Sequence, residues 1–161
     1  MEASAATAVR SKTVTVEVNG VEYEREVEAR RLLIHVLRDD LDLTGSHIGC
    51  DTGNCGACSL IVDGQLVKSC MMLAVQADGA TIETVEGLAD GDELTKLQQS
   101  FSDHHALQCG YCTPGMLMSA TALLREHPSP SEEQVRKALQ GNICRCTGYW
   151  NIVEAVKGAG A

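Results

Sequence analysis

The chain has 161 residues, enough for one domain or two small ones, and its apolar fraction of 44% is ordinary for a globular protein. Its net charge is −9, from 13 basic and 22 acidic residues, which argues against a nucleic-acid partner because that binding depends on neutralising phosphates. No apolar run approaches the roughly 18 residues of a membrane span. Because residues 1–12 carry no secretion signal, we expect a cytoplasmic protein, in which thiols stay reduced.

The N-terminal half is predicted to be rich in β-structure. Residues 1–11 are expected to form a flexible tail, and residues 12–86 a first domain. Valines alternate with polar residues on both sides of Asn19-Gly20, which predicts a β-hairpin with a type I′ turn. The elements expected next are a helix over Arg31–Asp40, a second hairpin over Ser59–Ser69 turned at Asp63-Gly64, a short helix over Met71–Gln76 and a strand over Thr81–Val85. This is the element order of a β-grasp ferredoxin.

The C-terminal part, residues 87–161, is predicted to be a helical domain. The expected helices are Asp92–His104, Gly115–His127, Glu132–Gln140 and Ile152–Lys157. Ser131 and Gln134 form a capping-box pattern at the start of the third. The fold class is therefore α+β, with a β-grasp domain followed by an all-α, four-helix domain.

The first four of the eight cysteines lie in the β-rich part. They read Cys50-x4-Cys55-x2-Cys58-x11-Cys70. The C-x4-C-x2-C run is the plant-type ferredoxin spacing, and four thiolates complete the ligand set of a [2Fe–2S] cluster. Glycines at 49, 53 and 56 permit the sharp turns that such a loop needs. A four-cysteine zinc site would favour paired C-x2-C knuckles, which this set lacks.

The second four cysteines lie in the helical part, as Cys109-x2-Cys112 and, 31 residues later, Cys144-x-Cys146. The first pair precedes one predicted helix and the second follows the next. An antiparallel helical hairpin would therefore bring all four to the same end. This spacing alone is compatible with zinc or with a second cluster. Arg145, between two of the cysteines, either offsets cluster charge or is simply solvated. The five histidines are interpreted as surface or packing residues.

Three motifs carry a resemblance to a known family. They are Gly49-Cys-Asp-Thr-Gly-Asn-Cys-Gly-Ala-Cys58, Leu107-Gln-Cys-Gly-Tyr-Cys-Thr-Pro-Gly115 and Gly141-Asn-Ile-Cys-Arg-Cys-Thr-Gly148. Over residues 12–157 the chain resembles the iron–sulfur subunit of the molybdenum hydroxylases, the xanthine oxidase family. Asp51-Thr52 and the run Val67-Lys-Ser-Cys-Met-Met-Leu-Ala-Val-Gln76 look most like the small subunit of aerobic carbon monoxide dehydrogenase. Asn54 and Trp150 depart from that subunit, which commonly has histidine and glutamine there.

The resemblance implies two [2Fe–2S] clusters and a non-catalytic, electron-transferring role within an oxidoreductase. The cluster on Cys109, Cys112, Cys144 and Cys146 would lie nearest a molybdenum–pterin (cytosine dinucleotide) cofactor in a large subunit. The cluster on Cys50, Cys55, Cys58 and Cys70 would lie nearest FAD in a medium subunit. Gln108 matches the family's glutamine that hydrogen-bonds the pterin, and Cys146 the ligand that approaches it. From the residues alone, Gln108 could instead cap a helix and Cys146 be an ordinary ligand.

The resemblance further implies a dimer of heterotrimers without a membrane span of its own, linked to the membrane at most through an acceptor such as a quinone. Carbon monoxide is the first expected substrate, with an aldehyde, a purine or an N-heterocycle as the alternative, because the large subunit chooses the substrate. The alternatives from other classes are a free-standing ferredoxin and a zinc-stabilised interaction module. No nucleophile–base pair and no nucleotide-binding glycine motif occurs, so no catalytic residue is expected in this chain.

Overall fold

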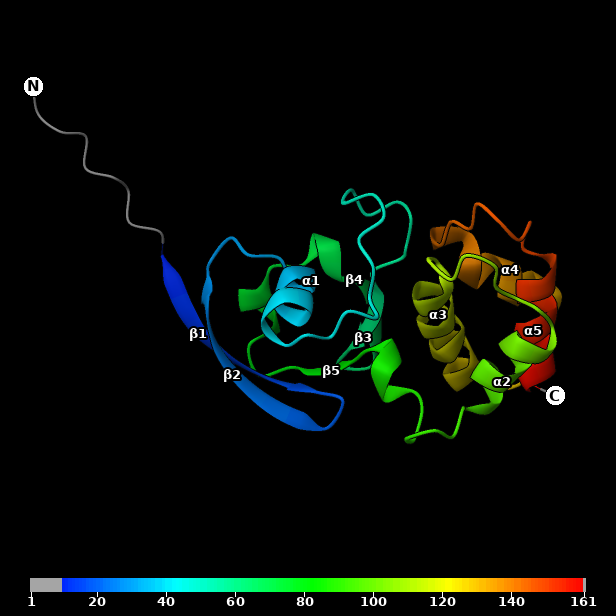
Figure 1. Cartoon of the computed structure of the whole chain (residues 1–161), viewed down its shortest axis with the longest axis horizontal. Coiled ribbons are helices and arrows are strands. Elements are labelled where there is room, and N and C mark those ends of the chain that lie inside the picture. The colour runs from blue at the N-terminus through cyan, green and yellow to red at the C-terminus, as the bar shows by residue number, and fades with distance from the viewer. Residues whose placement is uncertain (1–9, 161) are drawn as a thin grey trace, which may run out of the picture.

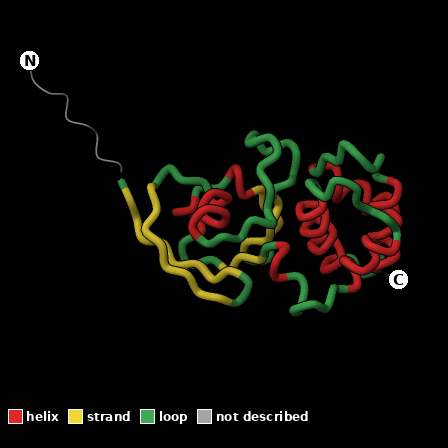
Figure 2. Tube along the Cα trace, in the orientation of Figure 1, coloured by secondary structure: helices red, strands yellow, loops and turns green. Residues whose placement is uncertain are grey.

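A computed structural model describes residues 10–160; most of the expected N-terminal tail, residues 1–9, lies outside the described residues, as does Ala161. Strands gather at one end of the molecule and longer helices at the other (Figures 1 and 2). The strands are β1 (Ser11–Val18), β2 (Val21–Glu28), β3 (Ser59–Val62), β4 (Gln65–Lys68) and β5 (Thr81–Glu83). They form one sheet in the order β2-β1-β5-β3-β4, in which β1 and β5 are parallel and the other neighbours antiparallel.

Both predicted hairpins are confirmed. Asn19 and Gly20 have φ of 52° and 79°, and Asp63 and Gly64 have φ of 48° and 78°. Two successive positive φ angles define the type I′ turn, whose twist matches that of paired strands. The β3–β4 turn matters for function because it pairs Ser59 with Lys68, and so returns the chain to the side of Cys58 just before Cys70.

The predicted first helix begins two residues late and widens midway. It runs as α1 (Leu33–His35) and continues as a π-helical turn, η1 (Val36–Asp40). Leu33 and Leu37 are buried against β1, β3 and β5, where they complete the core of this domain with Val16, Leu60 and Ile82. The start is delayed because Leu32 is extended and bridges Leu73.

The predicted short helix over Met71–Gln76 is wrong in form. Two 3₁₀ turns replace it, η2 (Ser69–Met71) and η3 (Ala74–Ala77). The break has a physical cause: the Leu33 N–H donates to the Met72 carbonyl, and the Ala74 N–H donates to the Arg31 carbonyl, each at 2.8 Å. These bonds tie the stretch to the start of α1 and hold Met72 and Leu73, between the two turns, extended. The last strand is also shorter than predicted, since η4 (Val85–Gly87) follows it.

The helical end contains α2 (Lys96–Asp103), α3 (Thr113–Glu126), α4 (Glu132–Ala138) with a 3₁₀ turn η5 (Leu139–Gly141), and α5 (Trp150–Gly160). α2 starts four residues later than predicted because Thr95 is its N-cap, accepting from the Gln98 N–H. The predicted capping box of Ser131 and Gln134 is confirmed. Around Phe101, Met116 and Ile152, side chains of all four helices form one core.

Helix α3 joins the two ends of the molecule. It lies beside β3 (Figure 1), and its Arg125 makes two 2.7 Å hydrogen bonds to Glu83 of β5. Its N-terminus points toward the cysteine loop that precedes β3, so the helix fixes that loop relative to the helical domain. None of the helices in residues 10–160 combines the length and apolar character that a membrane span requires.

Candidate iron–sulfur sites

The first cysteine set is assembled by one loop and one hairpin. Cys50, Cys55 and Cys58 lie in the loop between η1 and β3, and Cys70 lies in η2 after β4. Cys58 and Cys70 are buried beside Ile34, whereas Cys50 and Cys55 are half-buried. The set therefore has a dry inner side and an outer side near the surface.

Backbone N–H groups turn toward the sulfur of Cys50. The N–H groups of Cys55 and Thr52 lie 3.3 and 3.5 Å from it. Positive φ at Asp51 and Gly53, 54° and 73°, aims the chain this way. Hydrogen bonds from Thr52, followed by that from Cys55, lower the pKa of the Cys50 thiol to about 6. The loop thus stabilises negative charge on sulfur, as a thiolate ligand requires.

Burial has the opposite effect on the pKa of the more deeply placed cysteines of both sets, which it raises. Burial, followed by the contact with Cys58, raises the pKa of Cys70 to about 11. In the second set, burial and then the contact with Cys144 raise the pKa of Cys112 to about 12. These sulfurs become thiolates only where a positive charge compensates them, which bound iron would provide.

Lys68 is a residue of this site that the sequence analysis missed. Its ammonium donates a 2.6 Å hydrogen bond to the Gly53 carbonyl, in the middle of the Cys50–Cys55 stretch. The side chain is partly buried, and it extends from the end of β4, two residues before Cys70. The lysine both supports the loop and brings a positive charge to it. Its position at the end of a strand has no local signature, because the contact is made across the hairpin.

The four cysteines of the second set lie close together, as we expected from an antiparallel helical hairpin. The sulfurs of Cys109 and Cys146 are 3.4 Å apart, and Cys112 interacts with Cys144. Cys112 precedes α3, and Cys144 lies in the loop between η5 and α5. Cys144 is buried and Cys112 half-buried, whereas Cys109 and Cys146 are exposed. This set therefore presents two of its four sulfurs at the protein surface.

Polar groups of the second loop gather around Cys144. The hydroxyl of Thr147 is 3.2 Å and its N–H 3.5 Å from the Cys144 sulfur. Burial raises the pKa of Cys144, but the hydrogen bonds, those from Thr147 foremost, outweigh it and leave the pKa lowered. The Tyr149 hydroxyl accepts from the Cys144 N–H at 2.8 Å. Tyr149, an aromatic residue close to this set, thus shapes the loop.

The donor set fits the expected cofactor chemistry. All eight cysteines are free thiols, so none is consumed by a disulfide. Sulfur ligands with N–H groups directed at them are what [2Fe–2S] clusters use. Within residues 10–160, no three cysteine, histidine, aspartate or glutamate side chains are arranged so that they could hold a metal ion. This finding does not conflict with a [2Fe–2S] cluster, because such a cluster distributes its four thiolates over two irons and does not gather them around one metal ion. The assignment of the eight cysteines as ligands stays a prediction.

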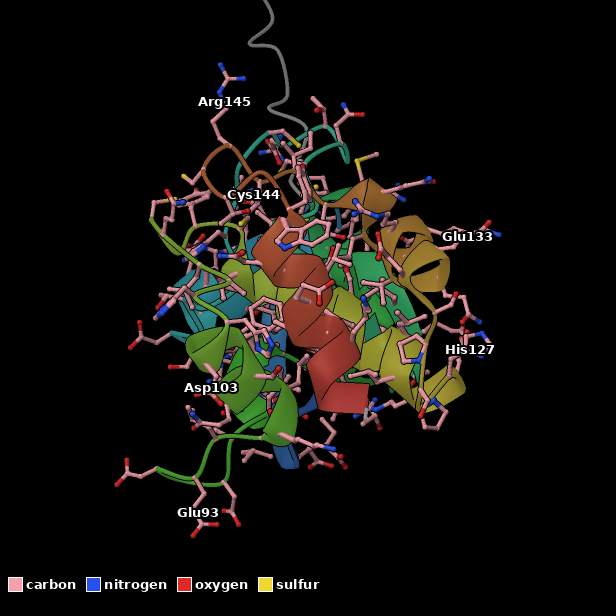
Figure 3. All side chains as sticks on the ribbon, turned by 90° about the vertical axis from the view of Figure 1, so that its right-hand side faces the viewer. Glu93, Asp103, His127, Glu133, Cys144 and Arg145 are labelled. Carbon is pink, nitrogen blue, oxygen red and sulfur yellow. The ribbon has the colours of Figure 1, made fainter. Side chains whose placement is uncertain are left out.

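The remaining predicted site residues lie on the surface. Gln108 is exposed beside Cys109 and sits between α2 and α3, at the end of neither, so it caps no helix. Arg145 is exposed and projects from its loop away from the protein, whereas Cys144 lies further inward (Figure 3). Trp150, the first residue of α5 after the same loop, is 60% exposed. These side chains are available to a partner.

The two cysteine loops also touch each other. The Ile143 N–H donates a 2.8 Å hydrogen bond to the carbonyl of Cys55. The His47 and Tyr111 rings stack with centroids 4.5 Å apart, and the Tyr111 hydroxyl donates to the Ile48 carbonyl at 2.8 Å. Tyr111 lies between Cys109 and Cys112, and residues 47 and 48 precede Cys50. His47, expected from the sequence to be a surface or packing residue, packs here between the two sites.

Comparison with known proteins finds an iron–sulfur domain over each cysteine set. A 2Fe-2S iron-sulfur cluster binding domain matches residues 16–95, and a [2Fe-2S] binding domain matches residues 84–157. The small subunit of nicotine 6-hydroxylase from Paenarthrobacter nicotinovorans is 56% identical over 143 residues, which are 89% of this chain and 86% of that one. Subunit gamma of caffeine dehydrogenase from Pseudomonas sp. (strain CBB1) is 49% identical over 91% of this chain and 90% of its own length.

Solved structures show the same likeness in three dimensions. A chain of quinoline 2-oxidoreductase from Pseudomonas putida 86 superimposes with a TM-score of 0.91 at 47% identity, covering 93% of this chain and 94% of that one. Identity at this level over nearly the full length, together with two matched cluster-binding domains, establishes common descent and not fold alone. The chain belongs to the iron–sulfur small subunits of the molybdenum hydroxylases, the xanthine dehydrogenase family.

Proposed function

We propose that the chain is the electron-transfer subunit of a molybdenum hydroxylase and carries one [2Fe–2S] cluster on each cysteine set. When bound, such a cluster accepts and releases a single electron. The observation that carries the proposal is the pairing of two four-cysteine loops that meet directly, through the Ile143 N–H and the Cys55 carbonyl. A free-standing ferredoxin needs neither the second loop nor this contact.

Each domain has its own part in the proposal. The β-grasp domain, residues 12–86, would hold the first cluster on Cys50, Cys55, Cys58 and Cys70 and face FAD in a medium subunit. The four-helix domain, residues 87–161, would hold the second on Cys109, Cys112, Cys144 and Cys146 and face the molybdenum–pterin cytosine dinucleotide in a large subunit. The exposure of Gln108 and Cys146 supports their assignment as the pterin contacts. Electrons would then run from molybdenum to FAD.

The partners are proposed from the same assignment. A large and a medium subunit would complete a heterotrimer, which would dimerise in the cytoplasm and pass electrons to an external acceptor such as a quinone. The apolar residues exposed around the second set support a subunit contact there: Leu107, Tyr111, Ile143 and Trp150 are each at least 42% exposed. Exposed aromatic and aliphatic side chains around a reactive centre are typical of a binding face.

For the substrate, the relatives favour an N-heterocycle. Their names specify nicotine, caffeine, nicotinate and quinoline. Two further relatives are named for aldehyde oxidation and xanthine dehydrogenation. We therefore put an N-heterocycle, a purine or an aldehyde ahead of carbon monoxide. Carbon monoxide, the first expectation from the Asp51-Thr52 and Val67–Gln76 motifs, is the second candidate.

The experiment is purification of the chain with its native partners, followed by reduction with carbon monoxide, aldehydes, purines and N-heterocycles in turn. The proposal expects a red-brown complex whose visible absorption bleaches with one of these substrates. Two distinct paramagnetic signals should then appear on reduction. A colourless complex that contains zinc would overturn the proposal, and bleaching by carbon monoxide alone would reverse the order of the two substrate candidates.

A further inference from the structure

The contact between the two cysteine loops rests on a buried polar chain, here called the junction: Gly56, Gly115, Ser119 and Asn142. The Asn142 side-chain amide donates to the Gly56 carbonyl at 3.1 Å, and its oxygen accepts from the Ser119 hydroxyl at 2.8 Å. Ser119 is 1% exposed and Asn142 4%. Such buried polar groups are costly unless paired, and here each has its partner.

The two glycines allow the backbones to meet. A Cβ added at Gly115 would lie 2.0 Å from the Gly56 oxygen, and a Cβ added at Gly56 would lie 2.3 Å from the Gly141 oxygen. The clashing atoms are backbone, so no side-chain rotation could relieve them. The loop before β3, the start of α3 and the turn after α4 are therefore in direct backbone contact, and side chains at these positions would separate them.

The junction holds the residues next to cluster ligands. Gly56 follows Cys55, and Asn142 precedes Ile143, which precedes Cys144. The bond from the Ile143 N–H to the Cys55 carbonyl lies between these residues, at 2.8 Å. Asn142 thus positions both the donor and the acceptor of that bond. Its backbone is joined to Ile143, which donates, and its side chain bonds Gly56, which follows the acceptor Cys55. Ser119, on α3, orients its amide.

We propose that Asn142, oriented by Ser119, is a positioning residue that sets the relative placement of the two clusters and so the rate of electron transfer between them. The inference rests on the proposed function. An asparagine suits the role because its amide donates and accepts at once. An aspartate of the same shape would still accept from Ser119 but could not donate to Gly56. The loop that carries Cys144 would then lose this hydrogen bond to the loop that carries Cys55, and the bond from the Ile143 N–H would hold them alone.

The test uses the full chain in complex with its native partners, reduced with dithionite. The magnetic interaction between two reduced clusters splits their electron paramagnetic resonance signals, and this splitting falls steeply with their separation. In Asn142→Asp and Ser119→Ala we expect both clusters at wild-type content, a smaller splitting and slower electron transfer between them. Gly115→Ala should reduce the splitting independently, since its methyl group drives the loops apart. The matched control is Asn151→Asp, at an exposed residue near the same loop.

The outcomes separate the two proposals. Absence of two clusters from the wild-type complex would overturn the proposed function. Two clusters whose splitting and transfer rate are unchanged in Ser119→Ala and Gly115→Ala would overturn the positioning role, even if those variants unfold more easily. If Asn142→Asp does not fold, the other two variants decide the question.

Discussion

The sulfur atoms of Cys109 and Cys146, 37 residues apart in the sequence, lie 3.4 Å from each other at the protein surface. Neither cysteine belongs to a helix; α3 and α4 form the hairpin that returns the chain to the same end. The four cysteines of the helical domain thus form one group, distinct from the four of the sheet domain. We therefore expect that each group can be disrupted without the other.

Substitution of one ligand in each group should remove one cluster only. In Cys70→Ser the cluster of the sheet domain should be lost, and in Cys112→Ser that of the helical domain, because each thiolate serves one group. Iron content and the two electron paramagnetic resonance signals measure this. Wild-type content of both clusters in either variant would contradict the grouping.

Gln108→Ala should leave both clusters in place and weaken assembly with the molybdenum subunit or electron flow from it. The side chain is exposed and caps no helix, so its removal costs the fold little. Substrate-driven reduction of the clusters, compared with reduction by dithionite, is the measurement. Gln99→Ala, at a surface glutamine of α2, is the matched control. Turnover equal to wild type would exclude the pterin contact.

Lys68→Met should lower the reduction potential of the sheet-domain cluster and leave that of the other unchanged. Reduction adds negative charge, which the ammonium bound to the Gly53 carbonyl at 2.6 Å favours. Redox titration followed by electron paramagnetic resonance resolves the two potentials. Lys12→Met serves as the control, since Lys12 pairs with Asp78 on the surface. A potential that stays the same or rises would show that the charge of Lys68 does not act on the cluster.

The ion pair of Glu83 with Arg125 should make a pH-dependent contribution to stability. The hydrogen bonds from Arg125 lower the pKa of Glu83, so the contribution is present above the ordinary glutamate pKa of about 4.3 and is lost as the pH falls through the lowered pKa. Both side chains are partly exposed, so Arg125→Gln should cost only about 1 kcal/mol at pH 7. Urea unfolding of both proteins over a pH series measures it. If the difference in unfolding free energy between wild type and Arg125→Gln does not become smaller toward acid pH, the ion pair is not its source.

Much of the local structure could be predicted from the sequence. The Asn19-Gly20 and Asp63-Gly64 pairs determine both hairpin turns because few other residues accept their positive φ. The Ser131 cap and the cysteine spacing likewise depend on neighbouring residues only. The predicted limits of helices and strands differ from the structure where distant groups decide them. At Met72, for example, the carbonyl accepts from the Leu33 N–H, and this bond breaks the helix predicted there.

What only the tertiary structure decided is the relation between the two cysteine sets. The Asn142 amide donates to the Gly56 carbonyl, 86 residues away in the sequence. The Tyr111 hydroxyl donates to the Ile48 carbonyl, 63 residues away. Lys68 reaches Gly53 across a hairpin. The sequence by itself determined which residues are predicted to bind iron, since that prediction rests on residue type and spacing. Which loops touch depends on how α3 packs against β3, because such long-range contacts arise from burial of whole faces and leave no periodic pattern in the chain.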